Sequence, residues 1–166
     1  MGGGNTIAPE QDSLLFGAAP WHNARRMAIF QRQLEVQTNG RGFTDLSERV
    51  ASCVSESRVS TGLCTVFIRH TSASLLIQEN ADPSVLRDLG KWLEKVAPES
   101  REYEHDDEGP DDMPGHLRAA LLHSNESIPV SGGKLVLGRW QAIYLAEHRA
   151  AAHTRQVVVH VQGDEA

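Results

Sequence analysis

Apolar and polar residues alternate along much of the chain from residue 28 onward. Between residues 28 and 37, apolar side chains such as Phe30, Leu34 and Val36 are separated by glutamines and a glutamate. This period of two is typical of a strand with one buried face. Further strands are predicted over residues 63–70, 75–77, 128–130, 135–147 and 155–162, which are rich in β-branched and apolar residues.

Other segments carry apolar residues at helical spacing. Helices are predicted over residues 46–54, 83–96 and 114–123. The second begins with Asp82 as a cap and Pro83 at the first helical position, whereas the acidic stretch 99–112 before the third predicts a long loop. Strands in series with a few helices between them predict an α+β fold, with a compact antiparallel β-sandwich or barrel-like core and two or three helices packed outside.

Composition and charge narrow the class of protein. The 166 residues are 40% hydrophobic and 23% charged, with a net charge of -6, so we expect a soluble globular chain without a nucleic-acid interface. Cys53 and Cys64 fit no paired metal or redox motif. With no signal peptide and no membrane-spanning stretch visible, a cytoplasmic location is expected. We predict a flexible N-terminal tail over residues 1–24 and a single domain over residues 25–166.

Polar residues at strand ends are the first candidates for function. His70 follows a predicted buried strand and has Ser72 beside it, although a structural histidine in a hydroxyl-rich turn is the alternative interpretation. Glu79 follows the strand at residues 75–77 and is a candidate for catalysis or ligand binding. Asp82, in contrast, needs no role beyond capping its helix.

Two further histidines occur later in the chain. His105 lies in the acidic loop and His116 on the next helix, so both can converge with His70. Neutral imidazoles bind zinc and similar ions, and catalytic sites commonly use three protein ligands with a position left for water. The spacing matches no compact zinc motif, and the acids of the loop also suit a solvated surface. We therefore expect a pocket for a divalent metal ion, zinc or magnesium, or for an anion at His70, His105 and His116.

Four runs of residues, 69–75, 79–85, 103–116 and 137–149, closely resemble the YjbQ family. The similarity extends in order, without large gaps, over residues 25 to 164. It implies a compact β-sandwich-like α+β fold that assembles as a homotrimer. Members of this family are often described as secondary thiamine-phosphate synthases, which is the activity that the resemblance implies here.

The resemblance also implies a set of site residues. It carries the histidine-lined pocket over to His70, His105 and His116. The candidates that accompany them are Ser72, Glu79, Gln141 and Arg155 for catalysis and Asp82 and Glu147 for cofactor binding. One departure lies at residues 151–155, where Ala-Ala-His-Thr-Arg replaces the His-Gly-Gly-Ser-Arg-like segment of close relatives. Because glycine adopts positive φ readily, its loss should change this hairpin, while Arg155 still matches.

The leading hypothesis for function is thiamine-phosphate formation, which joins an aminopyrimidine pyrophosphate to a thiazole phosphate. Glu79 or Gln141 would orient the pyrimidine and Arg155 would neutralise the departing pyrophosphate. The first alternative is a metal-dependent hydrolase that uses the same histidines around an activated water. The second is a non-catalytic trimer that binds a metal ion or a small ligand. The expected partner is a phosphate-bearing small-molecule substrate, with no nucleic acid and no membrane.

Overall fold

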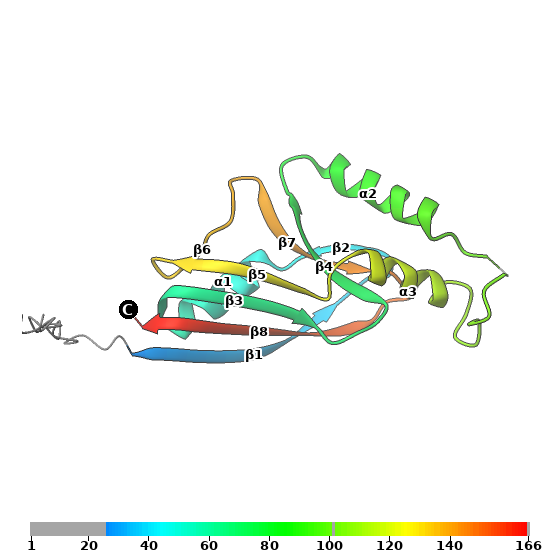
Figure 1. The fold of residues 1–166 in the computed structure, drawn as a ribbon. Helices are drawn as coiled ribbons and strands as arrows, with labels where there is room; N and C mark the ends of the chain where they lie inside the picture. The colour runs from blue at the N-terminus through cyan, green and yellow to red at the C-terminus, as the bar shows by residue number, and fades with distance from the viewer. Residues whose placement is uncertain (1–25, 101, 166) are drawn as a thin grey trace, which may run out of the picture.

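Two antiparallel sheets form the framework of the protein (Figure 1). The computed structural model describes residues 26–100 and 102–165, so the tail predicted for residues 1–24 lies outside the described residues. Sheet A contains, in spatial order, β1 (Met27–Gln37), β8 (Thr154–Glu165), β3 (Val59–Ile68), β5 (Asn125–Ser131) and β6 (Lys134–Leu135). Sheet B contains β2 (Gly42–Asp45), β7 (Gln141–Glu147) and β4 (Ala73–Glu79).

The main core lies between the inner face of sheet A, helix α1 (Ser47–Ser57) and one face of sheet B. Alternation along β8 directs Val157, Val159 and Val161 into this core, where all three are fully buried. Ile143 and Leu145 of β7 meet them from sheet B. Burial of such side chains is the main driving force for folding, so the alternating pattern in the sequence decides which face of each strand is inward.

Helix α2 (Pro83–Val96) covers the other face of sheet B (Figure 1). Leu86 and Leu89 of this helix pack near Leu76, Ala142 and Tyr144 of the sheet. Because both faces of β7 are covered, residues 142–148 are buried without interruption. Asp82 caps α2 as predicted, since its side chain accepts a hydrogen bond from the backbone N–H of Ser84 at 2.8 Å.

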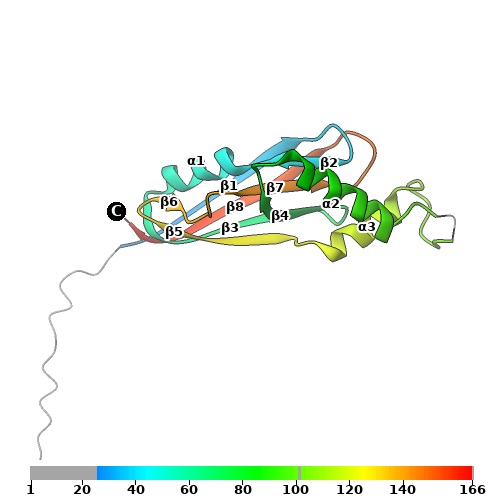
Figure 2. The same ribbon diagram turned by 90° about the horizontal axis from the view of Figure 1, so that it is seen from above.

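Helix α3 (Asp112–Leu121) lies at the end of the molecule where β4 begins, whereas α1 lies toward the opposite end (Figures 1 and 2). A close approach at Gly115 defines its position. A Cβ at this residue would lie 3.2 Å from the Cβ of Ser72 and 3.4 Å from the Cδ of Arg149, which is tighter than ordinary contact. Glycine therefore lets α3 sit directly against the turn before β4 and the loop after β7.

The α+β prediction, an antiparallel sandwich with helices outside, is confirmed. The single strand predicted over residues 135–147 is wrong: β6 and β7 belong to different sheets, and the chain between them turns at Gly138, whose carbonyl accepts the N–H of Gln141 at 2.9 Å. The third helix begins at Asp112 instead of Pro114, because proline is tolerated within a first helical turn. None of the described helices combines the length and apolar character needed to cross a membrane.

Candidate metal centre

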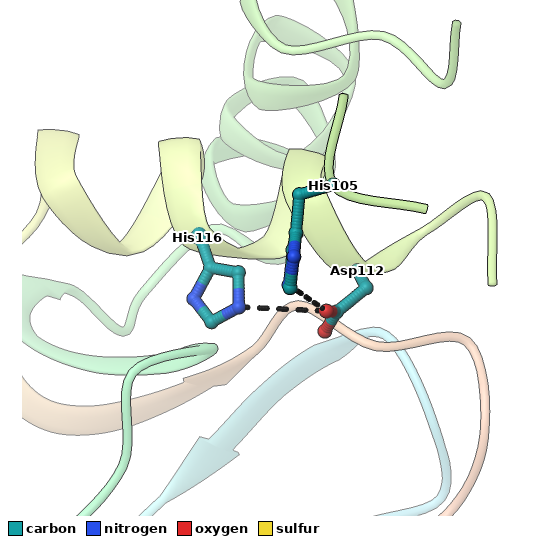
Figure 3. A group of neighbouring side chains, drawn as sticks. All are labelled: His105, Asp112 and His116. Carbon is teal, nitrogen blue, oxygen red and sulfur yellow. Dashed lines mark ion pairs between the residues drawn. The ribbon is translucent and has the colours of Figure 1, made fainter. Parts of the chain in front are cut away.

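Three side chains from the acidic loop and α3 converge on one point (Figure 3). One ligand atom each from His105, Asp112 and His116 lies within 4.8 Å of the others. The Nε2 atoms of His105 and His116 are 2.8 and 3.5 Å from the Oδ2 of Asp112. His116 follows Asp112 by one helical turn, so α3 itself places these two side chains on the same face.

Asp112 is the buried member of this group, with 2% of its side chain exposed. Its Oδ1 accepts a hydrogen bond from the guanidinium of Arg149, whereas its Oδ2 makes no hydrogen bond of acceptable geometry. A buried carboxylate oxygen without a hydrogen bond is costly, because the water that it lost is not replaced. The Oδ2 atom is therefore directed at a place where a cation would be stabilised.

His116 is oriented by its other ring nitrogen. Nδ1 lies 3.0 Å from the backbone carbonyl of Thr71, which accepts a hydrogen bond and therefore requires the proton on Nδ1. In the neutral imidazole, this leaves the lone pair of Nε2 facing Asp112. Metal-binding histidines commonly donate the other N–H to a carbonyl in this way, so the arrangement is the one that ligation needs.

The loop around the cluster is held by Arg149. Its guanidinium donates to Asp111 at 3.2 Å and to the backbone carbonyl of Glu108 at 2.8 Å, in addition to Asp112. Asp111 also accepts the N–H of Ala150 at 2.7 Å. Burial opposes ionisation of Asp111, but these hydrogen bonds together hold its pKa below the ordinary value. Arg149 thus joins the acidic loop to the end of β7.

His70 lies outside the group of three ligand atoms. Its Nδ1 accepts a hydrogen bond from the backbone N–H of Ser72 at 3.0 Å, and the hydroxyl of Ser72 lies 3.2 Å from the same atom. Burial, and next the positive charge of Arg155, lower the pKa of His70, while Glu147 opposes this effect. The expected ligand set therefore differs from the observed cluster, in which Asp112 takes the place expected for His70.

Glu147 and Arg155, both named as site candidates, form a buried ion pair. Two nitrogens of Arg155 donate to the two carboxylate oxygens of Glu147, each at 2.7 Å. Thr38 and the backbone N–H of Arg149 also donate to this carboxylate, each at 3.0 Å. Burial alone would raise the pKa of Glu147, but these donors lower it. The two side chains therefore satisfy each other's charge and hydrogen bonds inside the protein. The expected roles of Glu147 in cofactor binding and of Arg155 in neutralising pyrophosphate remain predictions.

Glu79, Gln141 and Asp82 occupy the other end of sheet B. Glu79 pairs with Gln141 in the register of β4 and β7, whereas Ala73 pairs with Glu147 at the opposite end. At about 3.4 Å per residue, these two ends are about 20 Å apart. The amide oxygen of Gln141 accepts the N–H of Gly138 at 2.7 Å. The structure thus does not bring these three candidates to the histidine cluster, and their catalytic role is a prediction that the geometry does not favour.

His148 is a buried histidine that the sequence did not single out. Its Nε2 lies 2.9 Å from the hydroxyl of Ser74, and 2% of the residue is exposed. Burial, followed by the charge of Arg118, lowers the pKa of His148 from 6.5 to about 4. The folded protein therefore resists protonation at a position where the unfolded chain accepts a proton.

We expect this histidine to make the protein less stable in mild acid. Between pH 6.5 and about 4 the unfolded state binds the additional proton, so the free energy of unfolding should fall by about 3 kcal/mol as the pH is lowered through this window. Urea unfolding at several pH values should show a smaller loss in His148→Gln, while exposed His123→Gln should behave like the wild type. An equal acid loss in His148→Gln would contradict this assignment.

Comparison with known proteins places this geometry in a family. A family model described as UPF0047 protein YjbQ-like matches residues 32–164. This range includes all the helices and strands described above, apart from the start of β1 and the end of β8. The chain belongs to the UPF0047 (YjbQ-like) family. The resemblance seen in the sequence is thereby confirmed.

UPF0047 relatives match the chain over most of its length. A UPF0047 protein of Synechocystis sp. is 50% identical over 135 residues, covering 81% of this chain and 92% of the relative. The YjbQ protein of Salmonella typhimurium is 38% identical over 136 residues, covering 81% and 99%. Among solved structures, a YbjQ-like protein of unknown function from Sulfolobus solfataricus has a TM-score of 0.78 at 25% identity, covering 84% of this chain and 100% of that one.

Of the three residues in this cluster, Asp112 is the one that was not predicted from the sequence. The signal was available, because an aspartate four positions before a histidine shares its helical face. The prediction that the helix begins at Pro114 left Asp112 in the loop, where it was one acid among many. In contrast, no residue spacing indicated that its neighbour Arg149 holds the second carboxylate oxygen.

Proposed function

We propose that this UPF0047 chain is a metal-dependent enzyme whose centre is formed by His105, Asp112 and His116. The observation that carries the proposal is the buried Oδ2 of Asp112, which has no hydrogen bond and faces two imidazole Nε2 atoms at 2.8 and 3.5 Å. Three ligand atoms bound tetrahedrally at about 2.1 Å would lie about 3.4 Å apart, so small side-chain shifts suffice for ligation.

The donor set favours zinc over magnesium. Two imidazole nitrogens and one carboxylate oxygen suit zinc, whereas magnesium prefers six oxygen ligands and retains its water. His105 and His116 are 49% and 31% exposed, so a bound ion would be accessible to water or substrate from the solvent side. An open position is the feature that distinguishes a catalytic zinc site from a closed structural one, and it supports the enzyme over the non-catalytic trimer.

When bound, zinc would supply Lewis-acid chemistry on a phosphate or carbonyl oxygen, or an activated water. The residues of this chain would hold the ion and orient its ligands: Thr71 fixes the proton of His116, and Arg149 fixes the second oxygen of Asp112. A small phosphate-bearing substrate is the expected partner. Thiamine-phosphate formation, implied by the family resemblance, is the first reaction to test, and phosphate-ester hydrolysis is the second.

Two further parts of the proposal concern assembly and location. A homotrimer is expected from the resemblance, and the outer face of sheet A offers an apolar surface that such an assembly would cover. This face exposes Ile29, Leu63 and Phe67, which are 70%, 37% and 44% exposed. We also propose that the protein is located in the cytoplasm.

The proposal is tested by zinc titration of tag-free protein after treatment with a chelator. We expect one zinc ion per chain to bind saturably, to raise the melting temperature, and to be required for turnover of a substrate panel. The panel contains the aminopyrimidine pyrophosphate with the thiazole phosphate, and simple phosphate esters. Magnesium at the same concentration is the control. Absence of saturable zinc binding would refute the metal centre, and zinc binding without any metal-dependent turnover would refute the enzyme.

A further inference from the structure

A cavity lined by both apolar and cationic side chains lies between α2 and the face of sheet B that this helix covers. Its volume is about 530 Å³, which is sufficient for a small organic molecule. Phe43, Leu86 and Ala146 contribute its apolar wall. None of the three residues of the metal centre lines this cavity, so it is a separate feature of the surface.

Arg118 makes this cavity unusual. The residue is 2% exposed and lines the cavity, yet its guanidinium forms no ion pair of 4.0 Å or less with a carboxylate among the described residues. One Nη donates to the carbonyl of Ala97 at 2.8 Å and the other lies 3.5 Å from the carbonyl of His148, while Nε has no partner. A buried charge without a counter-ion is strongly unfavourable, so an anion is the missing partner.

The charges around Arg118 act in both directions. Burial, followed by the positive charge of Arg41, lowers the pKa of Arg118, whereas Glu94, Glu99 and Asp111 oppose this effect from beyond ion-pair distance. Arg87 and Lys91 of α2 also line the cavity. Among the described residues Arg87 has no ion pair, whereas exposed Lys91 pairs with Asp88 at 3.1 Å.

The two carboxylates that line the cavity do not neutralise it. Glu147 accepts its hydrogen bonds from Arg155, Thr38 and Arg149. Glu94 lies 3.6 Å from Arg41, which also pairs with Glu99 at 2.7 Å. Four cationic side chains therefore line the space, and neither Arg87 nor Arg118 forms an ion pair of 4.0 Å or less with a carboxylate among the described residues.

We infer that the cavity between α2 and sheet B binds a small organic phosphate, with its phosphate group at Arg118 and Arg87 and its apolar body against Phe43 and Leu86. Several cations match a dianionic phosphate better than a singly charged carboxylate, because arginine forms two parallel hydrogen bonds to phosphate oxygens. The wall of Phe43, Leu86 and Ala146 suits an apolar body. This site is independent of the metal centre.

The test measures binding of phenyl phosphate to the chelator-treated full chain by titration calorimetry in a phosphate-free buffer. Gly90 lines the cavity, and a Cβ there would lie 3.8 Å from Phe43, so Gly90→Leu fills the space without strain on the helix. We expect saturable binding that weakens at least about tenfold in Gly90→Leu and in Arg118→Gln. Arg87→Gln should weaken binding about threefold, since the residue is on the exposed rim.

Matched variants distinguish binding in this cavity from a general effect of charge and from binding at the metal centre. Lys95→Gln removes a positive charge from the same helix outside the cavity, and His116→Ala removes the metal centre; both should bind phenyl phosphate as the wild type does. Benzoate should bind more weakly than phenyl phosphate. Wild-type binding in Gly90→Leu, or loss of binding in His116→Ala, would overturn the inference.

Two other results would also refute the phosphate site. If the wild-type chain gives no saturable binding and Gly90→Leu instead changes the sedimentation coefficient, the surface belongs to an interface between copies of the chain. Stronger binding of benzoate than of phenyl phosphate would overturn the assignment of the ligand as a phosphate. Because Gly90→Leu and Arg87→Gln do not remove a buried group, the test remains decisive even if Arg118→Gln fails to fold.

Discussion

Replacing Asp112 by asparagine is expected to weaken zinc binding at least about 100-fold, because even residues that only orient a metal ligand cost 10- to 100-fold when removed. The change preserves shape and removes one charged ligand oxygen. Arg149 retains Asp111 and Glu108 as partners, so the loop should remain attached to the end of β7. His116→Ala should show the same loss of zinc with an intact fold. Zinc affinity is measured by competition with a chromophoric chelator.

Controls for this experiment come from the same region of the chain. Asp107→Asn changes an exposed acid of the loop, and His123→Ala changes an exposed histidine that pairs with Glu126 at 2.9 Å. Neither residue belongs to the cluster, so both variants should bind zinc normally. Wild-type zinc affinity in Asp112→Asn would show that the convergence of the three side chains is only a structural ion pair.

Arg155→Met is expected to cost about 3 to 5 kcal/mol of unfolding free energy, because it leaves the carboxylate of Glu147 buried without its cationic partner. Arg155 and Glu147 are 3% and 2% exposed, so water cannot replace the lost hydrogen bonds without rearrangement. The double variant Arg155→Met with Glu147→Leu should recover much of this loss, since a buried ion pair can be replaced by apolar groups at little net cost. Urea unfolding provides the measurement.

The exposed pair between Arg32 and Glu56 is the matched control. Their side chains are 41% and 44% exposed, and Arg32→Met should therefore change stability little. If Arg155→Met were as mild as Arg32→Met, or if the double variant were less stable than the single one, the buried pair would not be the stabilising element described above.

The sequence predicted those parts of the fold that depend on repeated local patterns. Alternation along β1 and β8, and the capped start of α2 at Asp82, appear in the structure as predicted. Strand β2 was missed, because its four residues Gly42–Asp45 carry no alternation and become a strand only by pairing with β7. Residues 135–147 were assigned to one strand because the alternation continues through the turn at Gly138, and alternation alone does not indicate a change of sheet.

The candidate site was predictable in part. His105 and His116 were recognised from residue type and lie with their ring centroids 5.4 Å apart, whereas His70, which was expected to join them, lies outside the cluster. The contribution of Asp112 depends on where α3 begins, and the engagement of Arg155 with Glu147 depends on which partner a charge finds in three dimensions. The i,i+4 spacing of Asp112 and His116 indicates a shared face only if the helix is known to begin at Asp112, and no spacing indicates the second contact. The same holds for Arg118, whose burial beside a cavity is a property of how α2 and sheet B pack.

Gly115 influences the geometry of the metal centre although it has no side chain. The missing side chain allows α3 to rest on Ser72 and Arg149, and this contact sets how far Asp112 and His116 reach toward His105. A single added methyl group would require Ser72, Arg149 or α3 to shift by a few tenths of an ångström. The absence of a side chain at this position therefore contributes to the spacing of the centre.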